Sequence, residues 1–113
     1  MSNAVMLVED DTVQRGLVAD MLRDEGFEVV ECATAEAAEF VVESTGAKLQ
    51  ALITDNKLAG PMSGMELAAH ARGRFPELNV VIISGRPAEA LPDRTTFLRK
   101  PFLPSRLLEA IRA

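Results

Sequence analysis

Acidic residues follow two apolar segments of the sequence and could hold a metal ion. They are Glu9, Asp10, Asp11 and Asp55. Carboxylates that gather in one crevice repel one another, so such a group needs raised pKa values or a bound cation. Mg²⁺ suits it, because this hard ion binds carboxylates, water and phosphate oxygens. The other interpretation of the run 9–11 is a solvated helix start, with Asp11 as the N-cap and Gln14 at N3.

Asp55 is the candidate for covalent chemistry. A carboxylate can accept a phosphoryl group, while a metal ion neutralises charge on the transferring oxygens. Lys100 would supply an ammonium group to the same phosphate, and Ser84 would supply a rotatable hydroxyl. As isolated residues these are an ordinary turn aspartate, surface lysine and strand-end serine. Their convergence on one site is what favours phosphoryl chemistry.

Two further cationic residues lie near these positions. Lys57 comes two residues after Asp55, and Arg86 comes two residues after Ser84. The main-chain carbonyl of Lys57 could also ligate a hard cation. A phosphoryl group on Asp55 would form an acyl phosphate. We hypothesise that the Lys57 and Arg86 side chains contact this acyl phosphate and change the access of water to it. Lys57→Ala and Arg86→Ala would then alter the dephosphorylation rate, and an unchanged rate in both variants would contradict the hypothesis.

The elements that must position these residues alternate along the chain. Segments 5–8, 51–53 and 80–83 are continuously apolar, as in strands that are covered on both faces. Segments 27–31 and 95–98 mix polar and apolar residues, as in strands at the margins of a sheet. Helical periodicity lies between them, which predicts an α/β fold with parallel strands in the order 2-1-3-4-5. Ligands bind beyond the carboxyl ends of such strands, where the candidate residues would converge.

Apolar stripes predict the helices that cover this sheet. The stripes are Val13, Leu17 and Met21, then Ala35, Ala38 and Val42, then Leu67, Ala68 and Ala71, and last Leu107, Leu108 and Ile111. Gly26 is placed to end the first helix as a C′ residue, and Gly46 to end the second. Ser63 and Glu66 form a capping box for the third helix, and Pro104 suits the N1 position of the last.

The fourth crossover, residues 85–94, differs from the others. It contains Pro87 and Pro92 and leaves room for at most about one helical turn. We therefore expect helix 4 of the fold to be short or degenerate.

Length and composition limit the kind of protein. The 113 residues are enough for one domain, 1–113, with a single core, and the one cysteine, Cys32, has no partner for a disulfide. A net charge of −5 argues against a nucleic-acid-binding surface. No apolar run is long enough to span a bilayer, and the N-terminus lacks the basic and apolar regions of a secretory signal. These features predict a cytoplasmic domain that binds neither nucleic acid nor membrane.

Together, these motifs resemble the receiver domain of two-component response regulators across essentially the whole chain. The resemblance rests on the acidic run 9–11, LITD at 52–55, GPMSGMEL at 60–67, SG at 84–85 and FLRKPF at 97–102. It implies a flavodoxin-like fold with three layers, α/β/α, and a five-stranded sheet. It also implies that Asp55 accepts a phosphoryl group from a phosphohistidine on a sensor histidine kinase or a phosphotransfer domain.

The same resemblance implies roles for the other residues, with Mg²⁺ as the cofactor. The implied ligands are Asp10, Asp11, Asp55 and the Lys57 main-chain carbonyl, with Glu9 as an accessory. Ser84 and Lys100 would engage the phosphoryl group. Phe97 would be the switch residue, whose side chain turns inward when the Ser84 hydroxyl moves. The bond between Lys100 and Pro101 is expected to be cis.

Some features depart from the commonest form of the family. The loop 56–63 is one residue longer than the short version, which resembles receivers of hybrid kinases and some stand-alone regulators. The segment between Ser84 and Lys100 is shorter than is usual in the family. This puts in doubt the usual output face, which the fourth helix forms with the fifth strand and the fifth helix. Phe97 has no hydroxyl, so a switch through a tyrosine hydrogen bond is excluded. We expect a monomer or a weak homodimer.

The leading interpretation is a switch module that catalyses its own phosphorylation and dephosphorylation and has no separate substrate, so it is not an enzyme in the usual sense. One alternative is a Mg²⁺-dependent phosphatase of the haloacid-dehalogenase type, which also uses an aspartyl nucleophile at a strand end. That family requires a second aspartate where this chain has Lys57. The other alternative is a receiver-like interaction module that is not phosphorylated, and the complete set of acidic, serine and lysine residues argues against it.

Overall fold

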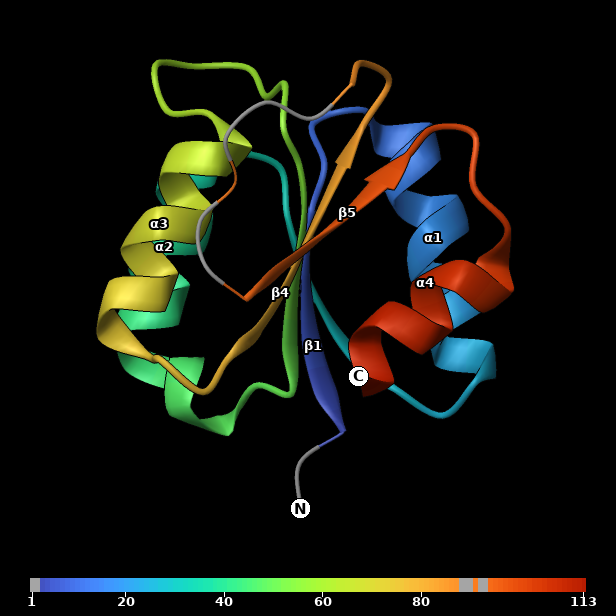
Figure 1. Cartoon of the computed structure of the whole chain (residues 1–113), viewed down its shortest axis with the longest axis horizontal. Coiled ribbons are helices and arrows are strands. Elements are labelled where there is room, and N and C mark those ends of the chain that lie inside the picture. The colour runs from blue at the N-terminus through green and yellow to red at the C-terminus, as the bar shows by residue number, and fades with distance from the viewer. Residues whose placement is uncertain (1–2, 88–90, 92–93) are drawn as a thin grey trace.

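The chain folds into five strands, four α-helices and one short 3₁₀ segment, in a computed structural model that describes residues 3–87, 91 and 94–113. In chain order the elements are β1 (Ala4–Val8), α1 (Thr12–Asp24), β2 (Glu28–Cys32), α2 (Ala35–Thr45), η1 (Gly46–Lys48), β3 (Ala51–Asp55), α3 (Gly64–Arg74), β4 (Asn79–Ser84), β5 (Thr95–Arg99) and α4 (Pro104–Arg112). The strands pair in parallel in the order β2-β1-β3-β4-β5, which confirms the predicted topology. Helices α1 and α4 cover one face of the sheet, and α2 and α3 cover the other (Figure 1).

Two apolar layers explain why the central strands are continuously apolar. Alternate residues of a strand point to opposite faces, so Val5 and Leu7 of β1 pack under α1 and α4. Met6 and Val8 of the same strand pack under α2 and α3. Both faces exclude water, and each buried aliphatic side chain contributes about 1.5–3 kcal/mol to folding. Within the part of the chain that the structure describes, no helix is long and apolar enough to cross a membrane.

The expected helix ends are present. Gly26 lies at C′ of α1 with a φ of +92°, and its amide donates to Arg23 O while the Phe27 amide donates to Leu22 O. This pair of bonds is a Schellman motif, in which glycine supplies the left-handed conformation. Ser63 and Glu66 form the predicted capping box at the start of α3. That box fixes the first turn of α3 directly beside the end of β3.

The apolar stripe predicted for α1 is wrong in part. Val13 and Leu17 are 71% and 67% exposed, while Ala19 and Leu22 are fully buried and Met21 is only partly buried. Apolar residues occupy more than one face of this helix, so periodicity alone does not decide which face meets the sheet. The face that includes Ala19 packs inward because a small side chain lets the helix approach the strands closely.

The fourth crossover contains no helix in its described residues, 85–87, 91 and 94. The short or degenerate helix predicted between β4 and β5, which is not α4, falls mostly on residues 88–90 and 92–93. These residues, Pro92 among them, lie outside the described part. Leu91 packs against the core beneath α2 and α3.

Candidate functional site

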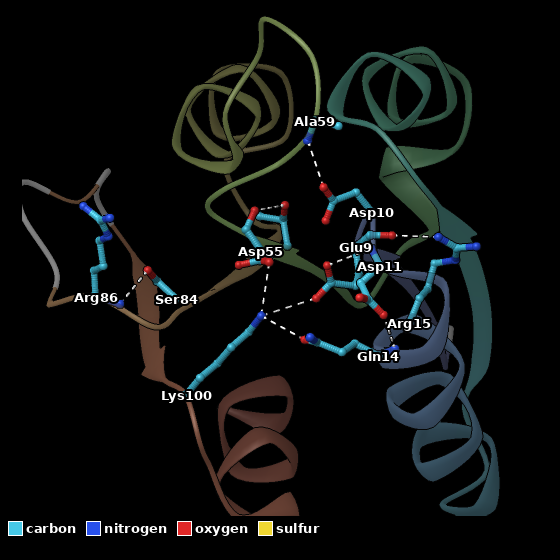
Figure 2. Close-up of polar contacts among 11 residues, drawn as sticks. Glu9, Asp10, Asp11, Gln14, Arg15, Asp55, Ala59, Ser84, Arg86 and Lys100 are labelled. Atoms are coloured by element: carbon cyan, nitrogen blue, oxygen red, sulfur yellow. Dashed lines mark hydrogen bonds and ion pairs between the residues drawn. The ribbon is translucent and has the colours of Figure 1, made fainter.

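The carboxyl ends of four strands bring the candidate residues together at one edge of the sheet. Asp55 is the last residue of β3 and Ser84 is the last residue of β4. The acidic run follows β1, and Lys100 follows β5, where it reaches back toward Asp55 (Figure 2). The parallel register places Asp55 opposite Ile83, so the ends of the two central strands lie level. The topology inferred from apolar segments is therefore what assembles the site.

Three carboxylates form a compact acidic cluster among the described residues. Glu9, Asp10 and Asp55 each offer an oxygen, and these oxygens lie within 4.8 Å of one another. The donor set consists of carboxylate oxygens, which suits a hard divalent cation such as Mg²⁺. These residues therefore fit a metal site, and Glu9, predicted as an accessory, lies in the same cluster as Asp10 and Asp55.

The structure corrects the assignment of Asp11 as a metal ligand. Its side chain is exposed and turns back onto helix α1, where Oδ1 accepts a hydrogen bond from the Gln14 amide at 2.9 Å. This is the N-cap role that the sequence offered as the other interpretation. The Asp11 carboxylate thus satisfies the first turn of α1 and is not one of the three clustered carboxylates.

Lys100 is the cation at the centre of the site. Its Nζ lies 3.1 Å from Asp55 Oδ2, 3.4 Å from Glu9 Oε1 and 3.2 Å from Gln14 Oε1. Gln14 was predicted only as the N3 residue of the helix, and no sequence signal distinguished it as a contact of Lys100. It comes into reach because the first turn of α1 begins at the same edge of the sheet.

The electrostatics of the site favour added positive charge. Burial raises the pKa of the Glu9 carboxyl, which is 7% exposed; contacts with Asp10 and Asp55 act in the same direction, and the Asp11 amide and Lys100 oppose them. Burial acts to lower the pKa of Lys100, but its hydrogen bond and charge interaction with Asp55, together with Glu9, raise it overall. One ammonium group thus faces three carboxylates, and a cation bound to the cluster would relieve their mutual repulsion.

Acidic side chains also anchor the loop that follows β3. Asp10 Oδ2 accepts a hydrogen bond from the Ala59 amide at 3.1 Å (Figure 2). Glu36, at the start of α2, accepts one from the Met62 amide at 3.0 Å. The loop carries Lys57 over the edge of the sheet, and Lys57 lines the same cavity as Asp55. Two anchors from different elements therefore hold the rim of the site.

Three further predicted site residues come from β4, the segment after it, and β5. They are Ser84, Arg86 and Phe97. The Ser84 hydroxyl is buried and accepts a hydrogen bond from the Arg86 amide at 3.1 Å. Phe97, in the middle of β5, is half-buried and packs against the core beneath α2 and α3. All three residues line the cavity that contains Asp55. The structure thus brings together every predicted site residue except Asp11. The bond between Lys100 and Pro101 is cis, as expected.

Gly64 has a role at the site that the sequence did not indicate. A Cβ atom at this position would clash with the Asp55 main-chain oxygen and would lie 2.8 Å from Asn56 Cα. The Gly64 amide also donates to Asn56 O at 2.9 Å. The start of α3 therefore lies directly on the backbone of the candidate nucleophile, which only glycine permits. In the sequence, Gly64 stands between the capping-box residues Ser63 and Glu66, within the motif at 60–67, and nothing there indicates its contact with Asp55.

Comparisons with known proteins agree with this geometry. The family model of the response regulator receiver domain matches residues 5–112. The chain is 28% identical to a response regulator receiver protein of known structure from Sinorhizobium medicae, with a TM-score of 0.88. The alignment covers 98% of this chain and 92% of that protein. The chain is 32% identical to the receiver domain of the hybrid histidine kinase CckA, with a TM-score of 0.84 and coverage of 96% and 95%.

A full-length relative gives the same result. The chain is 31% identical to the nitrogen assimilation regulatory protein NtrX of Azorhizobium caulinodans over 96% of its own length. It spans about a quarter of that relative, 25%. The strand order, the acidic cluster and these matches lead to one conclusion: the chain belongs to the family of response regulator receiver domains of two-component systems.

Proposed function

We propose that this receiver domain is a phosphorylation-controlled switch, which takes a phosphoryl group onto Asp55 from a phosphohistidine of a sensor histidine kinase or phosphotransfer domain. The observation that carries the proposal is the contact of Lys100 Nζ with Asp55 Oδ2 at 3.1 Å, beside two further carboxylates. A lysine in this position can transfer its ion pair from the carboxylate to a phosphoryl oxygen. Phosphorylation would thereby change the contacts of Lys100 with Glu9 and Gln14.

The transfer itself needs few groups. An oxygen of Asp55 attacks phosphorus, the phosphorus–nitrogen bond breaks, and the imidazole leaves with the electron pair. Glu9, Asp10 and Asp55 would hold Mg²⁺, and the ion, when bound, would supply positive charge to the transferring oxygens. The Ser84 hydroxyl can rotate to donate to the phosphoryl group while it keeps its bond from the Arg86 amide.

The first test is direct phosphorylation of Asp55. With acetyl phosphate and Mg²⁺, we expect the intact mass of the wild type to increase by one phosphoryl group. The adduct should be absent in Asp55→Asn and in an EDTA control, because the first lacks the nucleophile and the second the cation. If no adduct forms under conditions in which another receiver domain is labelled, the chain is an interaction module without phosphotransfer.

The same variant separates the switch from a phosphatase. We propose that the chain catalyses only its own phosphorylation and dephosphorylation, because the position two residues after Asp55 is Lys57 and offers no second carboxylate. Incubation with p-nitrophenyl phosphate and Mg²⁺ should therefore give no turnover. Metal-dependent hydrolysis that disappears in Asp55→Asn would contradict this and favour the haloacid-dehalogenase type of enzyme.

Exposed apolar residues beside the site support a protein as the phosphoryl donor. Val13 and Leu17 on α1 and Leu103 before α4 are all more than half exposed, and α1 and α4 cover the same face of the sheet (Figure 1). Leu17 lines a cavity of about 490 Å³ that reaches Asp55 and Lys100. Apolar side chains that gather on a surface mark protein interfaces. A donor that docks here would place its phosphohistidine at Asp55.

Leu17→Asp tests this docking surface. We expect transfer from a phosphorylated histidine-phosphotransfer domain to slow by at least about tenfold, because a charged side chain would be buried in the interface. Labelling by acetyl phosphate should stay unchanged. Phe40→Asp is the matched control, since Phe40 is 81% exposed but lies on α2, across the sheet. Equal slowing in both variants, or no slowing in Leu17→Asp, would place the donor elsewhere.

A further inference from the structure

Two cavities meet at Asp55 and Lys100, which line both of them. The smaller is the one beside α1 described above. The larger has a volume of about 860 Å³ and lies between the loop after β3 and the start of the fourth crossover. It also contains Ser84, Lys57 and Arg86, which the smaller cavity does not. A phosphoryl group on its way to Asp55 would therefore face the larger cavity on its cationic side.

The larger cavity is lined by charged and by apolar residues. The charged residues are Asp55, Lys57, Arg86 and Lys100. Its apolar wall consists of Leu58, Met62, Met65, Leu91 and Phe97. Each of these five side chains is half-buried and packs against the core beneath α2 and α3, so the wall is part of the folded structure. Small-molecule sites have this composition, in volumes of about 300–1,000 Å³.

Gly85, which follows Ser84, is part of the lining of the larger cavity. A Cβ atom built on Gly85 meets no atom of the described residues within 4 Å, although the residue lines the larger cavity. Its backbone is not in the left-handed region, since the positive φ values among the described glycines belong to Gly26 and Gly60. A side chain could therefore be added to this residue of the cavity lining without backbone strain and without a clash with the described residues.

We propose that the larger cavity binds the acyl part of acyl phosphates with an apolar or aromatic acyl group, such as benzoyl phosphate, so that these compounds phosphorylate Asp55 directly. The inference rests on the proposed function, since it uses the same nucleophile. An Asp55 oxygen forms a bond to phosphorus, and the bond from phosphorus to the acyl oxygen breaks. Benzoate leaves with the electron pair, its carboxylate beside Lys57 and Arg86 and its ring against the apolar wall. No other reactant is needed.

The test compares donors that differ in the acyl group. We expect the second-order rate constant for labelling by benzoyl phosphate to exceed that for acetyl phosphate by about tenfold, because a phenyl ring gains burial that a methyl group does not. A tenfold ratio corresponds to about 1.4 kcal/mol. Phosphoramidate, which carries no acyl group, serves as the reference for the reactivity of Asp55 in each protein variant. Intact mass measured over time gives the rates.

Two variants assign the effect to one cavity. Gly85→Leu should reduce the benzoyl-to-acetyl ratio to near one, because the new side chain adds bulk to the lining of the larger cavity, and labelling by phosphoramidate shows that the variant is folded and reactive. Val18→Ala, in the smaller cavity, should leave the ratio unchanged. A wild-type ratio near one, a ratio unaffected by Gly85→Leu, or a ratio lost only in Val18→Ala would each overturn the inference. If none of the three donors labels wild type, the proposed function fails, and this inference with it.

Discussion

Replacing Gly64 with alanine is expected to lower the free energy of unfolding by about 3 kcal/mol, the upper end of the cost of overpacking. The added methyl group would clash with the Asp55 main-chain oxygen and would lie 2.8 Å from Asn56 Cα. Both are backbone atoms, so the contact is relieved only if the start of α3 moves away from the end of β3. The same movement would displace the Asp55 carboxylate and reduce its labelling by acetyl phosphate.

Gly73→Ala is the matched control for this prediction. Gly73 lies in the same helix, and a Cβ atom there meets nothing within 4 Å among the described residues. Alanine should therefore stabilise the protein by about 0.5–1 kcal/mol, because glycine loses more conformational freedom in a helix. Urea unfolding of the metal-free proteins measures both changes. Similar small effects in the two variants would mean that α3 does not press on Asp55.

Asp10→Asn is expected to weaken Mg²⁺ binding by about 100-fold. Loss of a residue that merely supports a metal ligand costs about 10–100-fold, and Asp10 offers one of the three clustered oxygens that could hold the ion. Titration calorimetry with Mg²⁺ measures the dissociation constant. Asparagine at position 10 still has a side-chain oxygen that can accept the hydrogen bond from the Ala59 amide, so the loop after β3 keeps this anchor.

Asp11→Asn removes the same charge one residue further along and is the control. Asparagine caps a helix as well as aspartate does, so stability should be unchanged. The affinity for Mg²⁺ should stay within about twofold, because an exposed charge outside the cluster is screened by salt. A loss as large as that of Asp10→Asn would restore the assignment of Asp11 as a ligand and remove Glu9 from that role.

The fold could be predicted because the apolar signal of its strands is unambiguous. Residues 5–8 and 80–83 have no polar face, so they must be covered on both sides by helices. That requirement leads to a parallel sheet, and a parallel sheet places all its carboxyl ends at one edge. The convergence of Asp55, Ser84 and Lys100 follows from topology alone. No side-chain detail was needed to find the site.

The predictions that failed depended on the direction in which a side chain points, which its position in the sequence does not determine. Glu9 and Asp11 flank Asp10 in sequence, and only the cap formed with Gln14 determines that Asp11 turns toward the helix. Val13 and Leu17 have the right spacing for burial, but a second apolar face of α1 packs better against the strands. The close approach of Gly64 to Asp55 is likewise a property of how two elements meet. Such facts depend on tertiary contacts, which residue spacing does not contain.

The contact between Lys100 and Glu9 joins residues 91 positions apart in the chain. The site needs residues that follow β1 and β5, which lie far apart in the sequence. A chain that lacks β5 and the residues after it therefore also lacks the ammonium group of Lys100. During synthesis, the acidic residues leave the ribosome first and cannot form their ion pairs with Lys100 until residue 100 follows them. Acceptance of a phosphoryl group would then report that folding is complete, and an unfinished receiver could not take part in signalling.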